Sequence, residues 1–333
     1  MRALVSVAVG GPDTLVLRDD IPAPLPGADE LLIRVRACGV NYPDTLMIED
    51  KYQFRPPRPF APGGEVAGDV LAVGTGVTDF APGDRVLALV GHGGMAEQVV
   101  ARAAKTLKMP DGMPYDEAAA FVFTYGTSYH ALKQRAALQP GETLLVLGAA
   151  GGVGLAAVEL GVAMGARVIA AVSSADKLEL AKRHGAVDGL VYPRGPFDKD
   201  GAKALAEQFK TACGKHGADV VYDAVGGDYA EAALRAIAWE GRFLVVGFPA
   251  GIPRIPLNLP LLKGCQIVGI FWGAFTERDP VANAQNNAEL LAFYAAGKVR
   301  PYVSLRVPLE TGGQAIAELS ARRALGKIVV TID

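Results

Sequence analysis

The sequence predicts an α/β protein in which a β-rich domain accompanies a doubly wound parallel sheet. The chain has 333 residues, more than one hydrophobic core usually supports, so two domains are expected. Residues 1 to about 120 contain short strand patterns separated by Gly and Pro, which is typical of a barrel-like β domain. From about residue 123 to 265 strand and helix patterns alternate, as in a parallel sheet covered by helices.

Each predicted element follows from its apolar pattern. In the β-rich part we expect strands at 1–5, 31–37, 66–73 and 84–89, with turn signals such as Ala81-Pro82-Gly83-Asp84 between them. In the alternating part we expect strands at 144–147, 167–172, 220–224 and 243–247. The final strand pattern, 327–332, is expected to rejoin the first domain. The predicted division is therefore 1–122 with 266–333 in the β-rich domain, and 123–265 in the parallel-sheet domain.

A glycine-rich turn follows the apolar run 144–147 and precedes a helical pattern. It reads Gly148-Ala149-Ala150-Gly151-Gly152-Val153-Gly154. Such a strand-to-helix turn places a dinucleotide pyrophosphate at the helix N-terminus, where N–H groups without helical partners and the positive dipole end attract an anion. We therefore predict that Ala150, Gly151, Gly152 and Val153 contact a dinucleotide. The alternative is a tight turn in an ordinary strand–helix unit.

The end of the next strand indicates which dinucleotide binds. Sites specific for NAD carry an Asp or Glu there, which bonds the ribose 2′-hydroxyl. This chain instead has Ser173 and Ser174, followed by Asp176 and Lys177. Two hydroxyls and a cation suit a 2′-phosphate, so NADPH is predicted, with Asp176 pointing away from it. The alternative is that Ser174 only caps a helix and Lys177 is a solvated surface charge.

Composition excludes several other classes of protein. The net charge is −2, with no clustered Lys or Arg stripe, which argues against nucleic-acid partners. No apolar run approaches the length that spans a bilayer, and the start of the chain lacks the pattern of a signal peptide. The three cysteines have no spacing typical of a disulfide framework or a zinc site, which favours a cytoplasmic location. Cys38 is interpreted as a buried small hydrophobe.

Five motifs in this order make the chain resemble the medium-chain dehydrogenase/reductase superfamily over essentially its whole length. Besides the glycine-rich turn they are 38–44 (Cys-Gly-Val-Asn-Tyr-Pro-Asp), 62–68 (Pro-Gly-Gly-Glu-Val-Ala-Gly), 80–86 (Phe-Ala-Pro-Gly-Asp-Arg-Val) and 326–329 (Gly-Lys-Ile-Val). The resemblance implies a GroES-like catalytic domain, an inserted Rossmann domain and a nicotinamide cofactor.

The chain departs from the zinc-dependent branch of that superfamily. That branch has a second cysteine where this chain has Asn41, and a Gly-His-Glu motif where this chain has Gly63-Gly64-Glu65. Losing a thiolate and an imidazole together leaves too few ligands for a catalytic tetrahedral zinc. The cysteine cluster of a structural zinc is absent as well. We therefore predict no metal site.

Without these zinc ligands, the chain is similar to the zinc-free quinone oxidoreductase group of the superfamily. Its Asn-x-x-Asp motif corresponds to Asn41 and Asp44, and its tyrosine-bearing tip, Gly-x-Tyr, corresponds to Asp50-Lys51-Tyr52, which lacks the usual glycine. The resemblance implies a set of cofactor contacts beyond the glycine-rich turn: Tyr42, Thr127, Ser173, Ser174, Lys177, Tyr192, Gly247, Phe248, Phe271, Trp272 and Arg322. Ala321 replaces the usual Ser before that arginine. A homodimer, formed by edge strands of two Rossmann domains, is also implied.

The predicted function is NADPH-dependent hydride transfer to a quinone or another conjugated carbonyl without zinc. A conjugated acceptor spreads the developing charge, so it needs a Lewis acid less than a simple ketone does. Tyr52 is the predicted proton or hydrogen-bond donor, and Asn41 is predicted to hold the carbonyl oxygen or the cofactor ribose. Two alternatives stay open. One is an enoyl-thioester or 2-alkenal reductase, with Lys51, Arg55 and Arg58 receiving acyl-CoA phosphates; the other is a non-catalytic NADPH-binding protein.

Overall fold

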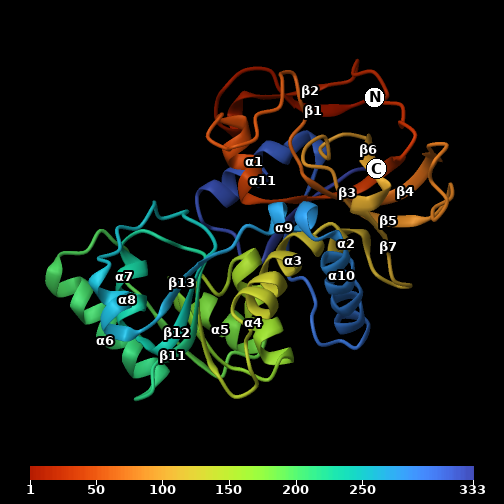
Figure 1. Ribbon diagram of the computed structural model, residues 1–333. Coiled ribbons are helices and arrows are strands. Elements are labelled where there is room, and N and C mark those ends of the chain that lie inside the picture. Colours follow the sequence, from red (N-terminus) through yellow and green to blue (C-terminus); the bar gives the residue numbers. More distant parts are fainter. The chain divides into compact units, whose positions relative to one another are not determined.

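The computed structural model describes residues 1–333, which form two compact units (Figure 1). Unit 1 comprises residues 1–123 and 301–333, and unit 2 comprises residues 124–300. Each unit has its own buried core, rich in Leu, Ile and Val in unit 1 and in Ala, Leu and aromatic residues in unit 2. The predicted class, a β-rich GroES-like domain with a Rossmann domain inserted in it, is confirmed.

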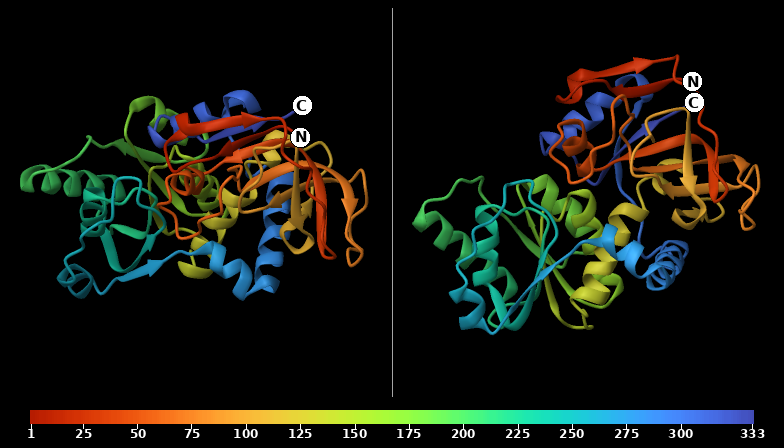
Figure 2. Two further views of the ribbon diagram at one scale, coloured as in Figure 1. Left: turned by 90° about the horizontal axis from the view of Figure 1, so that it is seen from above. Right: turned by 45° about the horizontal axis from the view of Figure 1, so that its top comes forward.

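Unit 1 is built on a seven-stranded sheet whose main order is β14-β15-β3-β4-β5-β7, with β6 paired to β3. The final strand β15 lies antiparallel to β3, so the end of the chain rejoins the first domain as predicted. A separate hairpin joins β1 to β2. Both chain termini lie close together in this unit in every view (Figure 2). The strands are β1 (Ala3–Ser6), β2 (Leu15–Arg18), β3 (Glu30–Val40), β4 (Glu65–Val73), β5 (Arg85–Leu89), β6 (Gln98–Arg102), β7 (Thr106–Lys108), β14 (Val303–Pro308) and β15 (Lys327–Thr331).

Three short helices complete unit 1: α1 (Tyr42–Ile48), α2 (Tyr115–Ala118) and α11 (Gly312–Ser320). Helix α1 begins at Tyr42 and has Pro43 in its first turn, where the missing N–H of proline costs nothing. It packs against α11, so the segment after Asn41 and the segment before Arg322 are neighbours.

Unit 2 holds a six-stranded, wholly parallel sheet of order β10-β9-β8-β11-β12-β13. This is the strand order of dinucleotide-binding domains, in which successive strands are added first on one side of the first strand, β8, and then on its other side. Helices α6, α7 and α8 lie on one side of the sheet, and α3 and α4 on the other (Figure 1). The strands are β8 (Thr143–Leu147), β9 (Arg167–Val172), β10 (Asp188–Val191), β11 (Ala218–Asp223), β12 (Ile237–Val245) and β13 (Gln266–Gly269). The helices are α3 (Val122–His130), α4 (Gly152–Ala163), α5 (Ala175–Arg183), α6 (Lys199–Cys213), α7 (Asp228–Arg235), α8 (Asn258–Lys263), α9 (Trp272–Arg278) and α10 (Pro280–Ala295).

The second domain boundary differs from the predicted one. Residues 266–300 were expected in the β-rich domain, but they belong to unit 2. The reason is that β13 pairs in parallel with β12 and completes the Rossmann sheet. The helices after it stay with unit 2, since the buried Asn286 of α10 exchanges side-chain hydrogen bonds with Gln134. No helix of the chain is long and apolar enough to cross a membrane.

Candidate active site

The glycine-rich turn joins β8 to α4 and has the geometry that the sequence predicts. Gly148 adopts φ +70°, and Gly151 precedes the first helical residue. A Cβ on Gly154 would lie 2.1 Å from the carbonyl oxygen of Gly148, so only glycine lets the helix approach the strand this closely. The first amides of α4 have no helical carbonyl to donate to. The turn therefore forms a backbone cradle that suits a pyrophosphate.

At the end of β9, Lys177 lies half-buried and donates from Nζ to the hydroxyl of Ser173, 3.1 Å away. Burial lowers the pKa of Lys177, Arg194 lowers it further, and Asp176 opposes them. The hydroxyl of Ser174 hydrogen-bonds the exposed Asp176 and lowers the pKa of that carboxyl. The strand end thus offers hydroxyls and a cation, with its one acid already engaged by Ser174.

Tyr192 follows β10, and its backbone N–H donates to the carbonyl of Val172, which places it beside the end of β9. Its ring is buried, 6% exposed, and packs on Tyr229 with ring centroids 4.8 Å apart. Arg194 lies two residues farther along and is exposed.

The predicted cofactor contacts Phe248, Phe271 and Trp272 differ in exposure. Phe248, after β12, and Phe271, before α9, are 43% and 59% exposed. Trp272 is buried instead, because its ring packs on Gly126, where a Cβ would lie 2.5 Å from Cζ2. Trp272 therefore fixes α9 against α3. Thr127, which follows Gly126 on α3, is half-buried.

One further contact ties α3 to the glycine-rich turn. The hydroxyl of Ser128, next to Thr127, donates to the carbonyl of Val153, 2.8 Å away. Just after β12, the backbone N–H groups of Val246 and Gly247 both donate to the carbonyl of Asp223. The Asp223 carboxylate is buried and accepts from the N–H groups of Val225 and Gly226. Burial raises its pKa to about 6. The Asp223 carboxylate therefore organises the turn that follows β11.

In unit 1, Asn41 lies in a buried polar network. Its Oδ1 accepts from Lys327 Nζ at 2.6 Å, and its Nδ2 donates to Glu65 Oε2 at 3.0 Å and to the carbonyl of Gly39 at 3.3 Å. Lys327 Nζ also lies 3.3 Å from Glu65 Oε2. Both amide hydrogens of Asn41 are thereby engaged inside unit 1, which the sequence could not indicate.

Asp44 locks the same loop. Its carboxylate accepts from the backbone N–H groups of Asn41, at 2.8 Å, and Gly63, at 3.0 Å. Burial raises its pKa to about 6, while these two hydrogen bonds act in the opposite direction. Asp44 therefore holds the start of α1 against the Gly63 turn.

Tyr52 follows α1 and packs partly against the core of unit 1. Burial raises the pKa of its hydroxyl, and the charge of Asp44 raises it further. Tyr42, the first residue of α1, is 36% exposed, and Arg322, just beyond α11, is exposed with φ +58°. Unit 1 thus carries Asn41, Tyr42, Tyr52 and Arg322, and the other predicted site residues belong to unit 2.

The cations predicted to receive acyl-CoA phosphates are mostly paired within unit 1. Lys51 pairs with Glu49 at 2.7 Å, and Arg58 pairs with Asp50 at 2.8 Å. Arg58 also donates to the carbonyl of Ile48 and lies over the ring of Phe60. Arg58 therefore anchors the loop that carries Tyr52.

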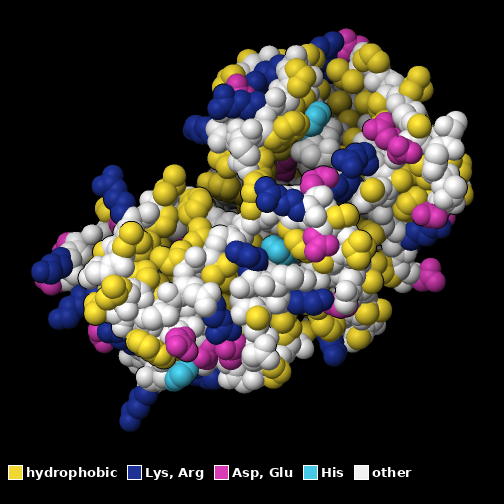
Figure 3. Space-filling model, viewed as in Figure 1, with side chains coloured by type: hydrophobic (Ala, Val, Ile, Leu, Met, Phe, Trp, Pro, Cys, Tyr) yellow, Lys and Arg dark blue, Asp and Glu magenta, His cyan; other side chains and the backbone are white.

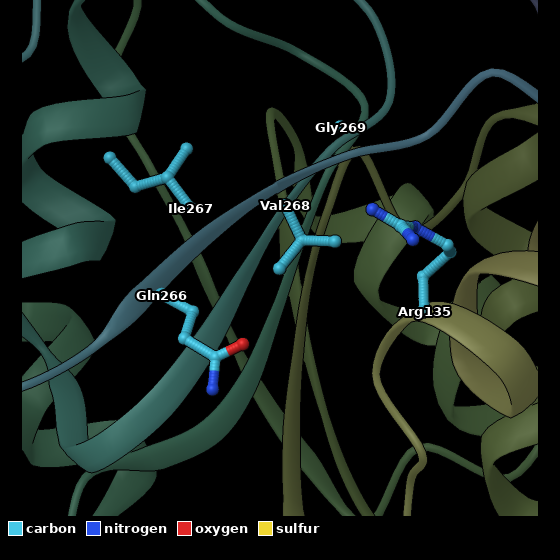
Figure 4. Close-up of a pocket in the computed structure, with 5 residues that line it drawn as sticks. All are labelled: Arg135, Gln266, Ile267, Val268 and Gly269. Carbon is cyan, nitrogen blue, oxygen red and sulfur yellow. The ribbon is translucent and has the colours of Figure 1, made fainter.

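No group of three or more His, Cys, Asp and Glu side chains lies where it could hold a metal ion. Cys38 is fully buried, and burial raises the pKa of its thiol well above the ordinary value. It is a buried small hydrophobe, as predicted. A hollow of about 500 Å³ lies at β13 and is lined by Arg135, Gln266, Ile267, Val268 and Gly269 (Figure 4).

Comparisons with known proteins agree with this geometry. The family described as "Alcohol dehydrogenase GroES-like domain" matches residues 27–111, and "Zinc-binding dehydrogenase" matches residues 152–287. A quinone oxidoreductase-like protein 2 homolog of Nematostella vectensis is 39% identical over 99% of this chain and 88% of its own length.

Two solved structures resemble the whole chain. A mycobacterial protein solved in complex with NADPH has a TM-score of 0.91 and 33% identity, covering 99% of this chain and all of its own. A quinone oxidoreductase of Thermus thermophilus, solved alone and with NADPH, has a TM-score of 0.82 and 34% identity, with the same coverage. The fold and the site define a medium-chain dehydrogenase/reductase. Within that class, the chain belongs to the quinone oxidoreductase group.

Proposed function

We propose that the chain is an NADPH-dependent oxidoreductase that reduces a quinone or another conjugated carbonyl without a metal ion. The main support for this proposal is the arrangement of residues at the carboxyl edge of the unit 2 sheet. There the glycine cradle of β8–α4 lies next to the Ser173–Lys177 pair at the end of β9. The NADPH-bound structures of two related proteins support the predicted cofactor.

The residues present fit that cofactor. The amides of Gly152 and Val153 at the start of α4 would hold the pyrophosphate, and Lys177 with Ser173 would hold the 2′-phosphate. When bound, NADPH supplies the hydride. The chain itself contributes binding, orientation and a hydrogen-bond donor for the acceptor.

Tyr52 is the donor that we propose for the acceptor's carbonyl oxygen. Both influences on its pKa act upward, so the hydroxyl stays protonated at neutral pH and can donate. Asn41 is proposed as a positioning residue, because its amide is bonded to Lys327 and Glu65 and so fixes the start of α1.

Replacing Tyr52 by phenylalanine is expected to lower kcat by about tenfold, somewhat less than the usual effect of removing a general acid. The NADPH dissociation constant should change less than twofold, because the ring and its packing are kept. Steady-state turnover with 9,10-phenanthrenequinone measures kcat, and nucleotide fluorescence measures the NADPH dissociation constant. The matched control is Tyr302→Phe in the same unit, which should match the wild type. Unchanged kcat in Tyr52→Phe would exclude the hydroxyl from the reaction.

A panel of acceptors separates the proposed substrate class from the enoyl thioester. NADPH oxidation should occur with 1,4-benzoquinone or crotonaldehyde and stay at background with crotonyl-CoA, since Lys51 and Arg58 are paired with Glu49 and Asp50. Turnover of crotonyl-CoA and of no other acceptor would instead identify an enoyl thioester as the substrate class. Tight NADPH binding without turnover of any acceptor would favour a binding protein.

We also propose that two copies associate through β13. This strand pairs only with β12, so its other edge exposes unpaired backbone groups, a feature that proteins usually cover. Hydrophobic side chains gather over α8 and β13 (Figure 3), and Ile267 and Val268 point to opposite sides of the strand (Figure 4). The exposed ones are Trp239, Leu257, Leu261, Leu262 and Ile267.

Light scattering during gel filtration should therefore give the mass of two chains. Ile267→Lys should shift the mass towards one chain by placing a charge at the shared edge. A wild-type mass of one chain at micromolar concentration would contradict this association.

A further inference from the structure

A buried chain of hydroxyl groups ends on the glycine-rich turn. Ser128 Oγ lies 2.8 Å from the carbonyl oxygen of Val153 and 2.9 Å from the hydroxyl oxygen of Tyr222. Ser128 comes from α3, Tyr222 from β11 and Val153 from the first turn of α4, so three elements meet at this point. The Ser128 and Tyr222 side chains are fully buried. Tyr222 also lies opposite Val146 of β8, the strand that leads into the turn.

The direction of each hydrogen bond in this chain is fixed by the groups that form it. A carbonyl oxygen only accepts, so Ser128 donates its single hydroxyl hydrogen to Val153. The Tyr222 hydroxyl must then donate to the Ser128 oxygen, because Ser128 has no second hydrogen to give. Burial raises the pKa of Tyr222, against the opposing effect of its bond to Ser128, so the hydroxyl stays protonated. The chain of donors therefore runs from β11 through α3 to the first turn of α4.

The last bond of this chain acts on the backbone that forms the cradle. The carbonyl of Val153 and the N–H of Gly154 belong to one planar peptide group, so holding the oxygen fixes the direction in which that N–H points. A carbonyl that accepts a hydrogen bond also polarises its own peptide group, which makes the N–H a stronger donor. Because Ser128 is fully buried, it acts on this backbone without reaching a ligand itself.

We propose that Ser128 is a positioning residue for the cofactor's pyrophosphate, and that Tyr222 holds the Ser128 hydroxyl in its donating orientation. The two side chains fix the first turn of α4, and the dinucleotide binds to the backbone that they hold. This inference rests on the proposed NADPH-dependent function and extends the cofactor site to two residues that no ligand touches.

The test is a titration of the full-length protein with NADPH, with NADH and with 2′-AMP, which carries the 2′-phosphate but no pyrophosphate. Nucleotide fluorescence follows NADPH and NADH directly, and displacement of NADPH measures 2′-AMP. Ser128→Ala should raise the dissociation constants of NADPH and NADH by the same factor, about fivefold, the size expected of one lost hydrogen bond. The constant for 2′-AMP should stay within about twofold of the wild type, because that ligand does not use the cradle.

The matched control is Thr106→Val. It removes another buried hydroxyl that donates to a backbone carbonyl, that of Arg102 in unit 1. This variant should bind all three ligands like the wild type.

A double variant separates positioning from stability. Ser128→Ala alone leaves the buried Tyr222 hydroxyl without its acceptor and should lower the melting temperature. Adding Tyr222→Phe removes that hydroxyl as well, so the melting temperature should return towards the wild type. The NADPH constant should nevertheless stay about fivefold raised, because Val153 still lacks its donor.

Wild-type NADPH affinity in Ser128→Ala, or its recovery in the double variant, would overturn the inference while the proposed function stands. Equal weakening of 2′-AMP would also overturn it, because a general loosening of unit 2 acts on both ends of the cofactor. A wild type that binds neither NADPH nor NADH would instead overturn the proposed function and the inference with it.

Discussion

Replacing Gly154 by alanine is expected to raise the NADPH dissociation constant by at least about 100-fold and to lower the melting temperature. The new Cβ would lie 2.1 Å from the carbonyl oxygen of Gly148 and 2.8 Å from its carbon. These atoms are backbone, so no side chain can move aside, and the turn itself must open. An opened turn loses the alignment of the first α4 amides that would hold the pyrophosphate. Fluorescence titration and thermal unfolding measure the two effects.

Gly151→Ala is the matched control for the fold. A Cβ there would meet only the Gly148 oxygen, at the ordinary contact distance of 3.5 Å, and φ is −84°. The melting temperature should stay within about 2 °C of the wild type, because surface changes without a clash cost little. Wild-type NADPH affinity in Gly154→Ala would contradict the assignment of the glycine-rich turn.

Lys327→Met is expected to lower the free energy of unfolding by about 3 to 5 kcal/mol, the usual cost of removing one partner of a buried ion pair. The Lys327 and Glu65 side chains are only 5% and 1% exposed. Without the ammonium group, Glu65 keeps hydrogen bonds from Phe123 N and Asn41 Nδ2 but loses its counter-charge. Urea unfolding followed by far-ultraviolet circular dichroism measures the change in the free energy of unfolding.

A double-mutant cycle separates the ion pair from simple packing. Glu65→Gln removes the buried charge, so Lys327→Met should cost clearly less in the Glu65→Gln background than in the wild type. Additive costs would show that the two charges are not coupled. A Lys327→Met protein within about 1 kcal/mol of the wild type would contradict the buried network as a source of stability for unit 1.

The local parts of the fold were predictable because their signals lie within a few residues. Strand β9 has the predicted bounds, 167–172, since a continuous apolar run between turn residues allows no other register. The boundary near residue 266 was wrong for a non-local reason. Strand β13 is short and largely exposed, and only its pairing with β12 shows to which sheet it belongs.

The same distinction applies to the site. The glycine-rich turn and the Ser173–Lys177 pair are contiguous in sequence and could be predicted. Asn41 was predicted as a site residue, but its buried network could not be, because its amide is engaged by Lys327, 286 positions away. Trp272 was predicted as a cofactor contact, but its burial on Gly126 needs a helix contact that no sequence pattern indicates.

The most direct test of the proposed function is NADPH oxidation at 340 nm with 9,10-phenanthrenequinone, using protein dialysed against EDTA and assayed for metal content. The expected result is turnover by metal-free protein, faster with NADPH than with NADH at equal concentration. Turnover that requires stoichiometric bound zinc, or that prefers NADH, would contradict the account.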